Sequence, residues 1–128
     1  MNNKVTYWME LSDYDIKTAE AMFKSERYLY VGFMAHQAIE KILKAHFVSI
    51  NGVTAPFSHS LSFLAKQSDI YKEFSEEQKD FIDLLEPMNI EARYPTHKEQ
   101  LLKSLTEKRC AEILKNANEL QKWIIQKL

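Results

Sequence analysis

The segment from Glu91 to His97 holds the residue types best suited to chemistry in this chain. It combines a guanidinium, a phenol and an imidazole, at Arg93, Tyr94 and His97. Arginine stays charged and grips phosphate with two hydrogen bonds, and histidine can move a proton near neutral pH. This set predicts metal-independent RNA cleavage, in which a 2′-hydroxyl attacks the neighbouring phosphate. His97 would act as general acid or base and Arg93 would neutralise the developing charge. The alternative is a surface ion pair of Arg93 beside a loop histidine.

A second group of polar residues follows helical spacing between residues 28 and 50. The polar stripe at positions i, i+3, i+4 and i+7 consists of Gln37, Glu40, Lys41 and Lys44. As a binding surface, its lysines would hold phosphate or its carboxylate would organise a neighbouring arginine. As a solvated helix face, it would gain roughly 0.3 kcal/mol from an i,i+4 ion pair of Glu40 and Lys44. Aromatic residues continue the stripe and the opposite face is apolar, so we expect this helix to have neighbours on both sides.

The histidines outside that segment are scattered. His59 lies in a loop, where it either bonds backbone groups or faces a site, and His46 falls in the middle of an apolar helix face, where we expect it to be mostly buried. His36 borders the same face. No pair of histidines has metal-ligand spacing, so we expect no metal site and no cofactor. The sequence also lacks the glycine-rich phosphate loop and the G-x-S-x-G serine motif.

Composition narrows the class of protein. The chain has 128 residues, of which 45% are hydrophobic and 27% charged, and we expect one domain over residues 1–128. The formal net charge of −1 argues against a protein that coats nucleic acid unspecifically. The lone Cys110 excludes an intramolecular disulfide and suits a reducing compartment. No signal-peptide run and no stretch of roughly 18 apolar residues is present, so we expect a cytoplasmic protein without a membrane partner.

Periodicity and capping residues predict the helices. With only two glycines and three prolines, the sequence favours long helices, predicted over about 3–24, 28–50, 75–88 and 105–128. Ser75 and Gln78 form a capping box, and Ser58 is expected to cap one short helix. Pro87 should end or kink its helix, and residues 95–104 are expected to form a connector. The predicted fold is an all-α, up-and-down bundle of four long helices and one short helix.

Several of these residues together resemble the HEPN domain, the higher eukaryote and prokaryote nucleotide-binding domain, in its small free-standing prokaryotic form. The resemblance covers nearly the whole chain. Its most specific parts are the run from Gln37 to Ala45 and the tetrapeptide Ala92-Arg93-Tyr94-Pro95. It is supported by Trp8, Asp15, Ala19, Tyr28, Phe33, Leu64 and the tripeptide His59-Ser60-Leu61.

The resemblance implies a helical bundle, a homodimer and a neighbouring minimal nucleotidyltransferase partner, in pairs that commonly act as toxin and antitoxin. Many members are metal-independent ribonucleases with an arginine, four to six residues and a histidine. Here only three residues separate Arg93 from His97, and Pro95 is one of them, so the chain departs from that motif.

Three functions follow from the residues and the resemblance together. The first is a binding module for a nucleotide or RNA. The second is a ribonuclease that uses Arg93 and His97, and the third is a non-catalytic assembly adaptor. The expected ligand-binding residues are Gln37, Glu40, Lys41, Lys44, His59 and Tyr94.

Overall fold

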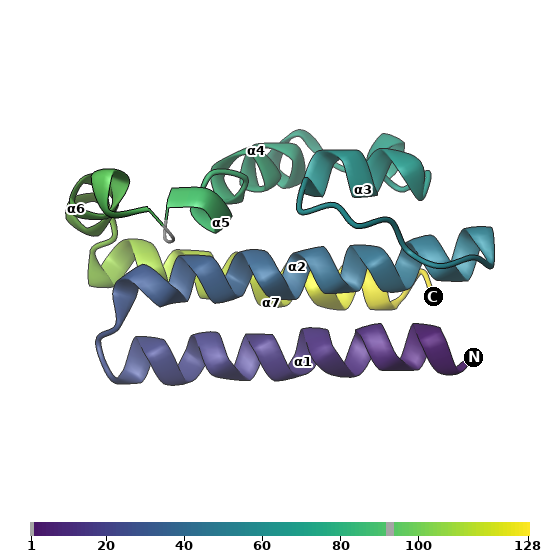
Figure 1. Ribbon diagram of the computed structural model, residues 1–128, viewed down its shortest axis with the longest axis horizontal. Coiled ribbons are helices and arrows are strands. Elements are labelled where there is room, and N and C mark those ends of the chain that lie inside the picture. Colours follow the sequence, from purple (N-terminus) through teal and green to yellow (C-terminus); the bar gives the residue numbers. More distant parts are fainter. Residues whose placement is uncertain (1, 92–93) are drawn as a thin grey trace.

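The computed structural model describes residues 2–91 and 94–128, with the side chains at positions 90–91 and 95–98 outside the description. All regular structure in this part of the chain is helical, which confirms the predicted all-α class. Three long helices, α1 (Asn3–Lys24), α2 (Tyr28–Asn51) and α7 (Glu107–Ile125), form the body of the bundle, and shorter helices lie across α2 (Figure 1).

The first two helices begin and end where the sequence predicts. The side chain of Asn2 accepts a hydrogen bond from the Val5 amide at 2.9 Å and caps the start of α1. Gly52 ends α2 in the left-handed conformation, with φ of 68°, which glycine adopts without a Cβ clash. α1 runs antiparallel to α2, while α7 runs parallel to α2 and ends near the N-terminus of the chain (Figure 1).

Shorter elements carry the chain back between α2 and α7. They are α3 (Leu61–Gln67), a 3₁₀ turn η1 (Tyr71–Glu73), α4 (Glu76–Leu85), α5 (Met88–Glu91) and α6 (Pro95–Ser104). The predicted capping box opens α4, because Ser75 accepts from the Gln78 amide and the Gln78 side chain accepts from the Ser75 amide. Pro87 separates α4 from α5, as predicted for a proline in this position.

Two sequence-based expectations are wrong in this region. Residues 95–104 form helix α6 rather than a connector, because Pro95 occupies its first turn, where a missing amide hydrogen costs nothing. The buried Leu101 at the end of α6 anchors it to the core. Ser60, not Ser58, caps α3, since Ser60 has the extended backbone of a cap and its hydroxyl accepts from the Phe63 amide.

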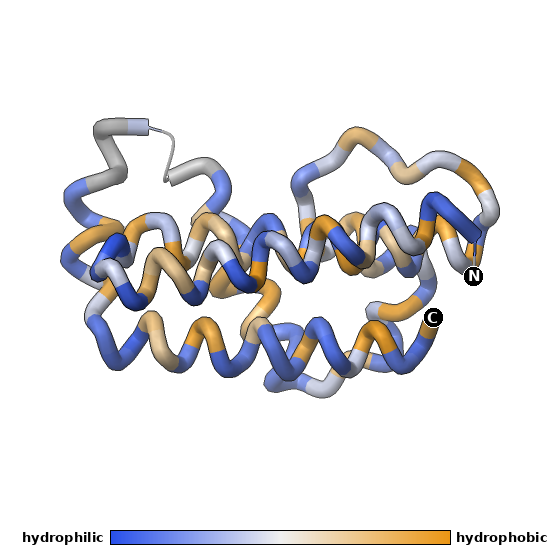
Figure 2. The backbone as a smooth tube through the Cα atoms, turned by 90° about the horizontal axis from the view of Figure 1, so that it is seen from below, coloured by the Kyte–Doolittle hydropathy of each residue, from blue (hydrophilic) through white to orange (hydrophobic). Residues whose placement is uncertain are grey.

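The core is apolar and centred on α2. Figure 2 shows hydrophobic and hydrophilic residues interleaved along the helices, the pattern of helices that bury one face. A buried polar contact fixes the register of the three long helices. The Ser12 hydroxyl donates to the Ala38 carbonyl at 2.7 Å, and the Gln121 amide donates to the Ser12 hydroxyl at 3.0 Å and to Asp13 at 2.9 Å. Each polar atom in this contact therefore has a hydrogen-bond partner that replaces the water lost on burial.

Candidate functional site

The polar stripe of α2 is enclosed rather than solvated. Glu40 is 3% exposed and Lys44 is 7% exposed, because α1 lies along one edge of the stripe and the loop after α2 lies along the other. Figure 2, viewed from below, places this loop on the side of the bundle away from α7. The prediction that α2 has neighbours on both sides is confirmed. The alternative of a solvated face is wrong, because neighbouring elements cover the charges.

The carboxylate of Glu40 organises a charged cluster at the middle of α2. One oxygen accepts from the Lys44 ammonium at 3.2 Å, and the other lies 2.9 Å from Nδ1 of His59. The imidazole of the fully buried His36 lies 3.9 Å from the same carboxylate. An ionised carboxylate can only accept, so its contact with His59 requires Nδ1 to carry the hydrogen. We call Glu40, Lys44 and His59 the Glu40 cluster.

Helix α1 contributes two further partners of the stripe. The Lys41 ammonium donates to the Asp15 carboxylate at 2.5 Å, and the Lys44 ammonium lies 5.2 Å from the centre of the Trp8 ring. Both lysines are therefore engaged inside the protein, Lys44 by a carboxylate and an aromatic face and Lys41 by a carboxylate. A buried charge needs such partners, since desolvation of an ion costs several kcal/mol. Lys41 keeps 20% of its side chain exposed at the edge of the cluster.

Gln37 connects the stripe to α5. Its amide donates to the Asn89 side chain at 2.8 Å, and Asn89 is buried. Close packing supports this contact, because α5 approaches α2 at Gly32, where an added Cβ would lie 2.6 Å from the Met88 sulfur. The predicted segment from Glu91 to His97 begins at the last residue of α5, so this contact holds the start of that segment against α2.

His59 is the accessible member of the Glu40 cluster, with 60% of its side chain exposed. Its loop is held in place because the Glu86 carboxylate accepts from the Ser62 amide at 2.9 Å at the start of α3. With Nδ1 directed to Glu40, the other ring nitrogen, Nε2, is free of hydrogen bonds to the described residues. Such an oriented imidazole can donate a hydrogen bond to a ligand anion when it is protonated, and accept one when it is neutral.

Of the other predicted site residues, the structure describes the side chain of Tyr94 but not those of Arg93 and His97. Tyr94 is 56% exposed and immediately precedes α6, so its ring is available to a ligand. Arg93 lies outside the described residues. His97 belongs to α6, but its side chain also lies outside the description. The two predicted catalytic groups are therefore not placed relative to the Glu40 cluster.

Other reactive groups lie in the core. Burial raises the pKa of the Cys110 thiol to about 11, which keeps it from acting as a thiolate nucleophile near neutral pH. His46 is buried as predicted, its Nδ1 has no hydrogen-bond partner among the described residues, and burial lowers its pKa. Within the described part of the chain no three histidine, cysteine, aspartate or glutamate side chains are grouped to hold a metal ion. None of the described helices has both the length and the apolar character that crossing a bilayer requires.

Reasoning from single helices missed two partners of the stripe. The roles of Asp15 and Asn89 depend on contacts between residues far apart in the chain, with Lys41 and Gln37 respectively. A signal for Asp15 was available, because it falls beside the apolar stripe of α1 that contains Trp8, and a carboxylate in such a place needs a partner. Asn89 follows Pro87 in a short segment where periodicity carries no information.

The chain folds as an all-helical bundle with a buried charged stripe on its central helix. The family model described as HEPN domain matches residues 5–128, and the chain belongs to this family. The crystal structure of TT1696 from Thermus thermophilus is similar to the structure of this chain. The TM-score is 0.84 and the sequence identity is 20%, over 99% of this chain and 100% of that chain. At this identity the likeness shows the fold alone. A search of curated proteins found no match.

Proposed function

We propose that this HEPN protein is a homodimeric binding module that recognises a nucleotide or RNA with the surface around His59. The observation that carries the proposal is the exposed imidazole of His59 held by Glu40, a carboxylate that is 3% exposed. Burying Glu40 and Lys44 is costly, and the arrangement leaves one oriented hydrogen-bonding group at the surface. A phosphate oxygen or a base edge is a ligand that such a group fits.

Exposed aromatic side chains support the same ligand class. Tyr94 is 56% exposed, and Phe63 on α3, the helix after the His59 loop, is 43% exposed. Aromatic rings stack on unpaired bases, and each such contact contributes about 1–3 kcal/mol. Because the two lysines are engaged by carboxylates inside the protein, stacking and directed hydrogen bonds would contribute more than general charge attraction. The binding should therefore depend only weakly on salt.

Binding of fluorescently labelled single-stranded RNA and of ATP tests this proposal. We expect His59→Ala to weaken binding about tenfold, because it removes the one oriented donor without opening the core. The matched control is Lys72→Ala, an exposed residue of η1 outside the site, which should bind like the wild type. Unchanged binding by His59→Ala would place the ligand elsewhere. If the wild-type dimer binds neither probe, the protein is an adaptor instead.

Metal-independent RNA cleavage is the second candidate function. The contact of Gln37 with Asn89 favours it, since the chain continues from this anchored position into Arg93, Tyr94 and His97. The test is cleavage of a labelled, structured RNA in EDTA by wild type, Arg93→Ala and His97→Ala. Loss of cleavage in both variants, with unchanged folding, would support a ribonuclease.

We further propose a minimal nucleotidyltransferase as partner and a toxin–antitoxin role. Co-purification of the two proteins would test the partnership.

A further inference from the structure

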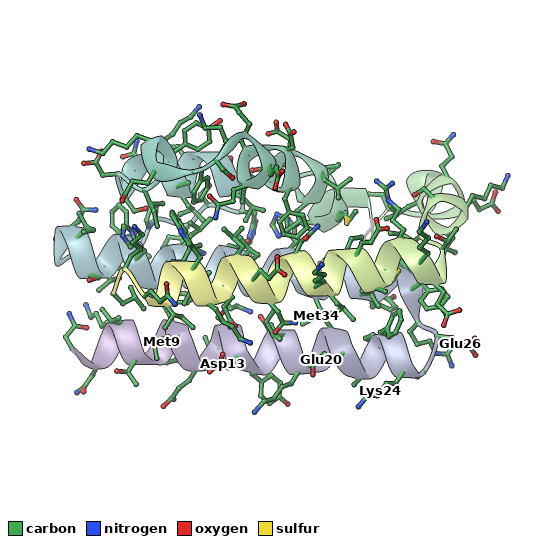
Figure 3. All side chains as sticks on the ribbon, turned by 180° about the vertical axis from the view of Figure 1, so that it is seen from behind. Met9, Asp13, Glu20, Lys24, Glu26 and Met34 are labelled. Carbon is green, nitrogen blue, oxygen red and sulfur yellow. The ribbon has the colours of Figure 1, made fainter. Side chains whose placement is uncertain are left out.

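A second concave surface lies on the part of the bundle formed by α4 and α7. It is an open groove of about 980 Å³ and shares no residue with the Glu40 cluster. α4 packs on α2, α3 and α5, while α7 packs on α1 and α2, so the groove separates two helices that have their main contacts elsewhere. Figure 3 views the molecule from the side of α7, with α4 above it.

The floor of the groove is apolar and firmly packed. Phe74, Phe81 and Leu120 line it and are each less than a tenth exposed. The ring of Phe74 lies 5.6 Å from that of Trp123, which also lines the groove. Leu84 and Trp123 remain half-buried, one on each wall of the groove. The Lys127 ammonium lies 4.7 Å from the centre of the Trp123 ring and pairs with Glu73 at 3.1 Å, so Leu84 and the uncovered part of Trp123 offer apolar surface to a partner.

The rims of the groove are negatively charged on both sides. Glu77 and Asp80 on α4 and Glu119 on α7 are exposed, and none of the three forms an ion pair with another described residue. Arg109, at the start of α7, is the one cation in the described lining. Like charges that face each other across a groove repel, and a cationic partner relieves that repulsion.

We propose that this groove binds a basic amphipathic helix of a partner protein. The apolar face of that helix would contact Leu84 and Trp123, and its lysines or arginines would pair with Glu77, Asp80 and Glu119. Both walls are helices, and a third helix packs between them by fitting side-chain ridges into grooves. The stretch of α7 from Arg109 to Trp123 is about 21 Å long, which matches roughly four turns of a bound helix. This surface acts independently of the nucleotide or RNA site.

A designed peptide probes the groove directly. We would label an amphipathic helix of about 18 residues, built from leucine and lysine without tryptophan, and measure binding to the full chain by fluorescence anisotropy. Asp80→Lys with Glu119→Lys should weaken binding at least tenfold. The same variant should gain binding to a peptide that carries glutamate in place of each lysine. The matched control is Asp83→Lys with Glu112→Lys, which makes the same charge change on exposed positions of α4 and α7 outside the groove.

The controls decide between a specific groove and general attraction. The control variant and wild type should bind the peptide within about threefold of each other, and a scrambled peptide of equal composition should bind much more weakly. Equal losses in both variants, equal binding of the scrambled peptide, or no binding at about 1 mM protein would overturn the proposal. If the Asp80→Lys, Glu119→Lys variant differs from wild type in oligomeric mass when no peptide is present, the groove is occupied by a second copy of the chain. That result would also overturn the proposal.

Discussion

At the scale of single residues, Glu40 joins helix α2 to the loop that follows it. It contacts Lys44 and, at longer range, the buried His36 on its own helix, and it contacts His59 in the loop. The pair with Lys44 has the i,i+4 spacing of an ordinary helix-surface pair. Its energetic role differs because both charges are buried, so that removing one leaves the other without compensation.

Glu40→Gln should lower the free energy of unfolding by about 3 kcal/mol, because the ammonium of Lys44 would remain buried without a counter-charge. Urea denaturation monitored by circular dichroism measures this change. The control is Asp69→Asn, which breaks the exposed pair with Lys72 and should cost no more than about 0.5 kcal/mol. Similar small losses in both variants would mean that Lys44 reaches water when Glu40 is neutral.

His46 should make the protein less stable in mild acid. Burial lowers its pKa from the ordinary value of 6.5, with the Glu73 carboxylate acting in the opposite direction and the Lys127 ammonium adding to the lowering. Below pH 6.5 the unfolded chain therefore binds a proton that the folded chain does not, and the free energy of unfolding falls as the pH decreases toward the pKa of the folded state.

Replacing the ring tests this origin of the pH dependence. His46→Leu removes the titrating group, so its free energy of unfolding should fall less than that of wild type between about pH 7 and pH 5. Thermal unfolding at a series of pH values provides the comparison. The control is Val48→Ala, a substitution at a buried apolar residue of the same helix, which should lower stability without changing its dependence on pH. A steeper acid dependence in His46→Leu than in wild type would contradict the prediction.

At the scale of elements, α5 is a short helix that leads into the predicted segment from Glu91 to His97. It is held to α2 by the contact of Gln37 with Asn89 and by the approach of Met88 to Gly32. Four helical residues have little intrinsic stability, so these tertiary contacts hold α5 in place.

Gly32→Ala should force the buried Met88 side chain to repack between α2 and α5, because the new Cβ would lie 2.6 Å from the Met88 sulfur. The overpacking outweighs the gain in helix propensity, and we expect a net loss of about 1 kcal/mol. NMR should show chemical-shift changes at Asn89 and Tyr94 relative to wild type. Gly52→Ala is the control, since it strains a left-handed residue at a comparable cost but meets no neighbouring atom. Equal NMR shifts at Asn89 in both variants would refute the role of this contact.

At the scale of the whole molecule, aromatic side chains remain on the outside of the bundle. Tyr30 continues the stripe of α2 and is 45% exposed, and Phe57 in the loop after α2 is fully exposed. Exposed aromatic rings are enriched in protein interfaces. They support the proposed homodimer and favour the side of the bundle that carries the loop.

Tyr30→Glu should therefore weaken self-association, because it places a charge in the proposed interface, at an expected cost of at least about tenfold in the dimer dissociation constant. Light scattering over a concentration series measures the mass. The control is Tyr14→Glu, a more exposed tyrosine on α1. An unchanged mass in Tyr30→Glu would move the interface elsewhere, with the region of α7 around Trp123 as the next candidate.

The sequence by itself determined the positions of most helices and the family. Helical periodicity, the Ser75 capping box, Gly52 and Pro87 are local signals, readable because the forces that start and stop a helix act within a few residues. The resemblance to the HEPN domain, which the family match confirms, rests on residues spread along the chain. Helix α6 was not predicted, because a proline indicates a break in a helix unless it is known to lie in the first turn.

Only the tertiary structure decided which polar groups meet. Lys41 pairs with Asp15, Gln37 with Asn89 and Glu40 with His59, in each case across different elements. Local spacing predicted the pair of Glu40 and Lys44 but not its burial. Burial depends on how α1, α5 and the loop after α2 pack around α2, and that packing changes the cost of leaving a charge unpaired from a fraction of a kcal/mol to several.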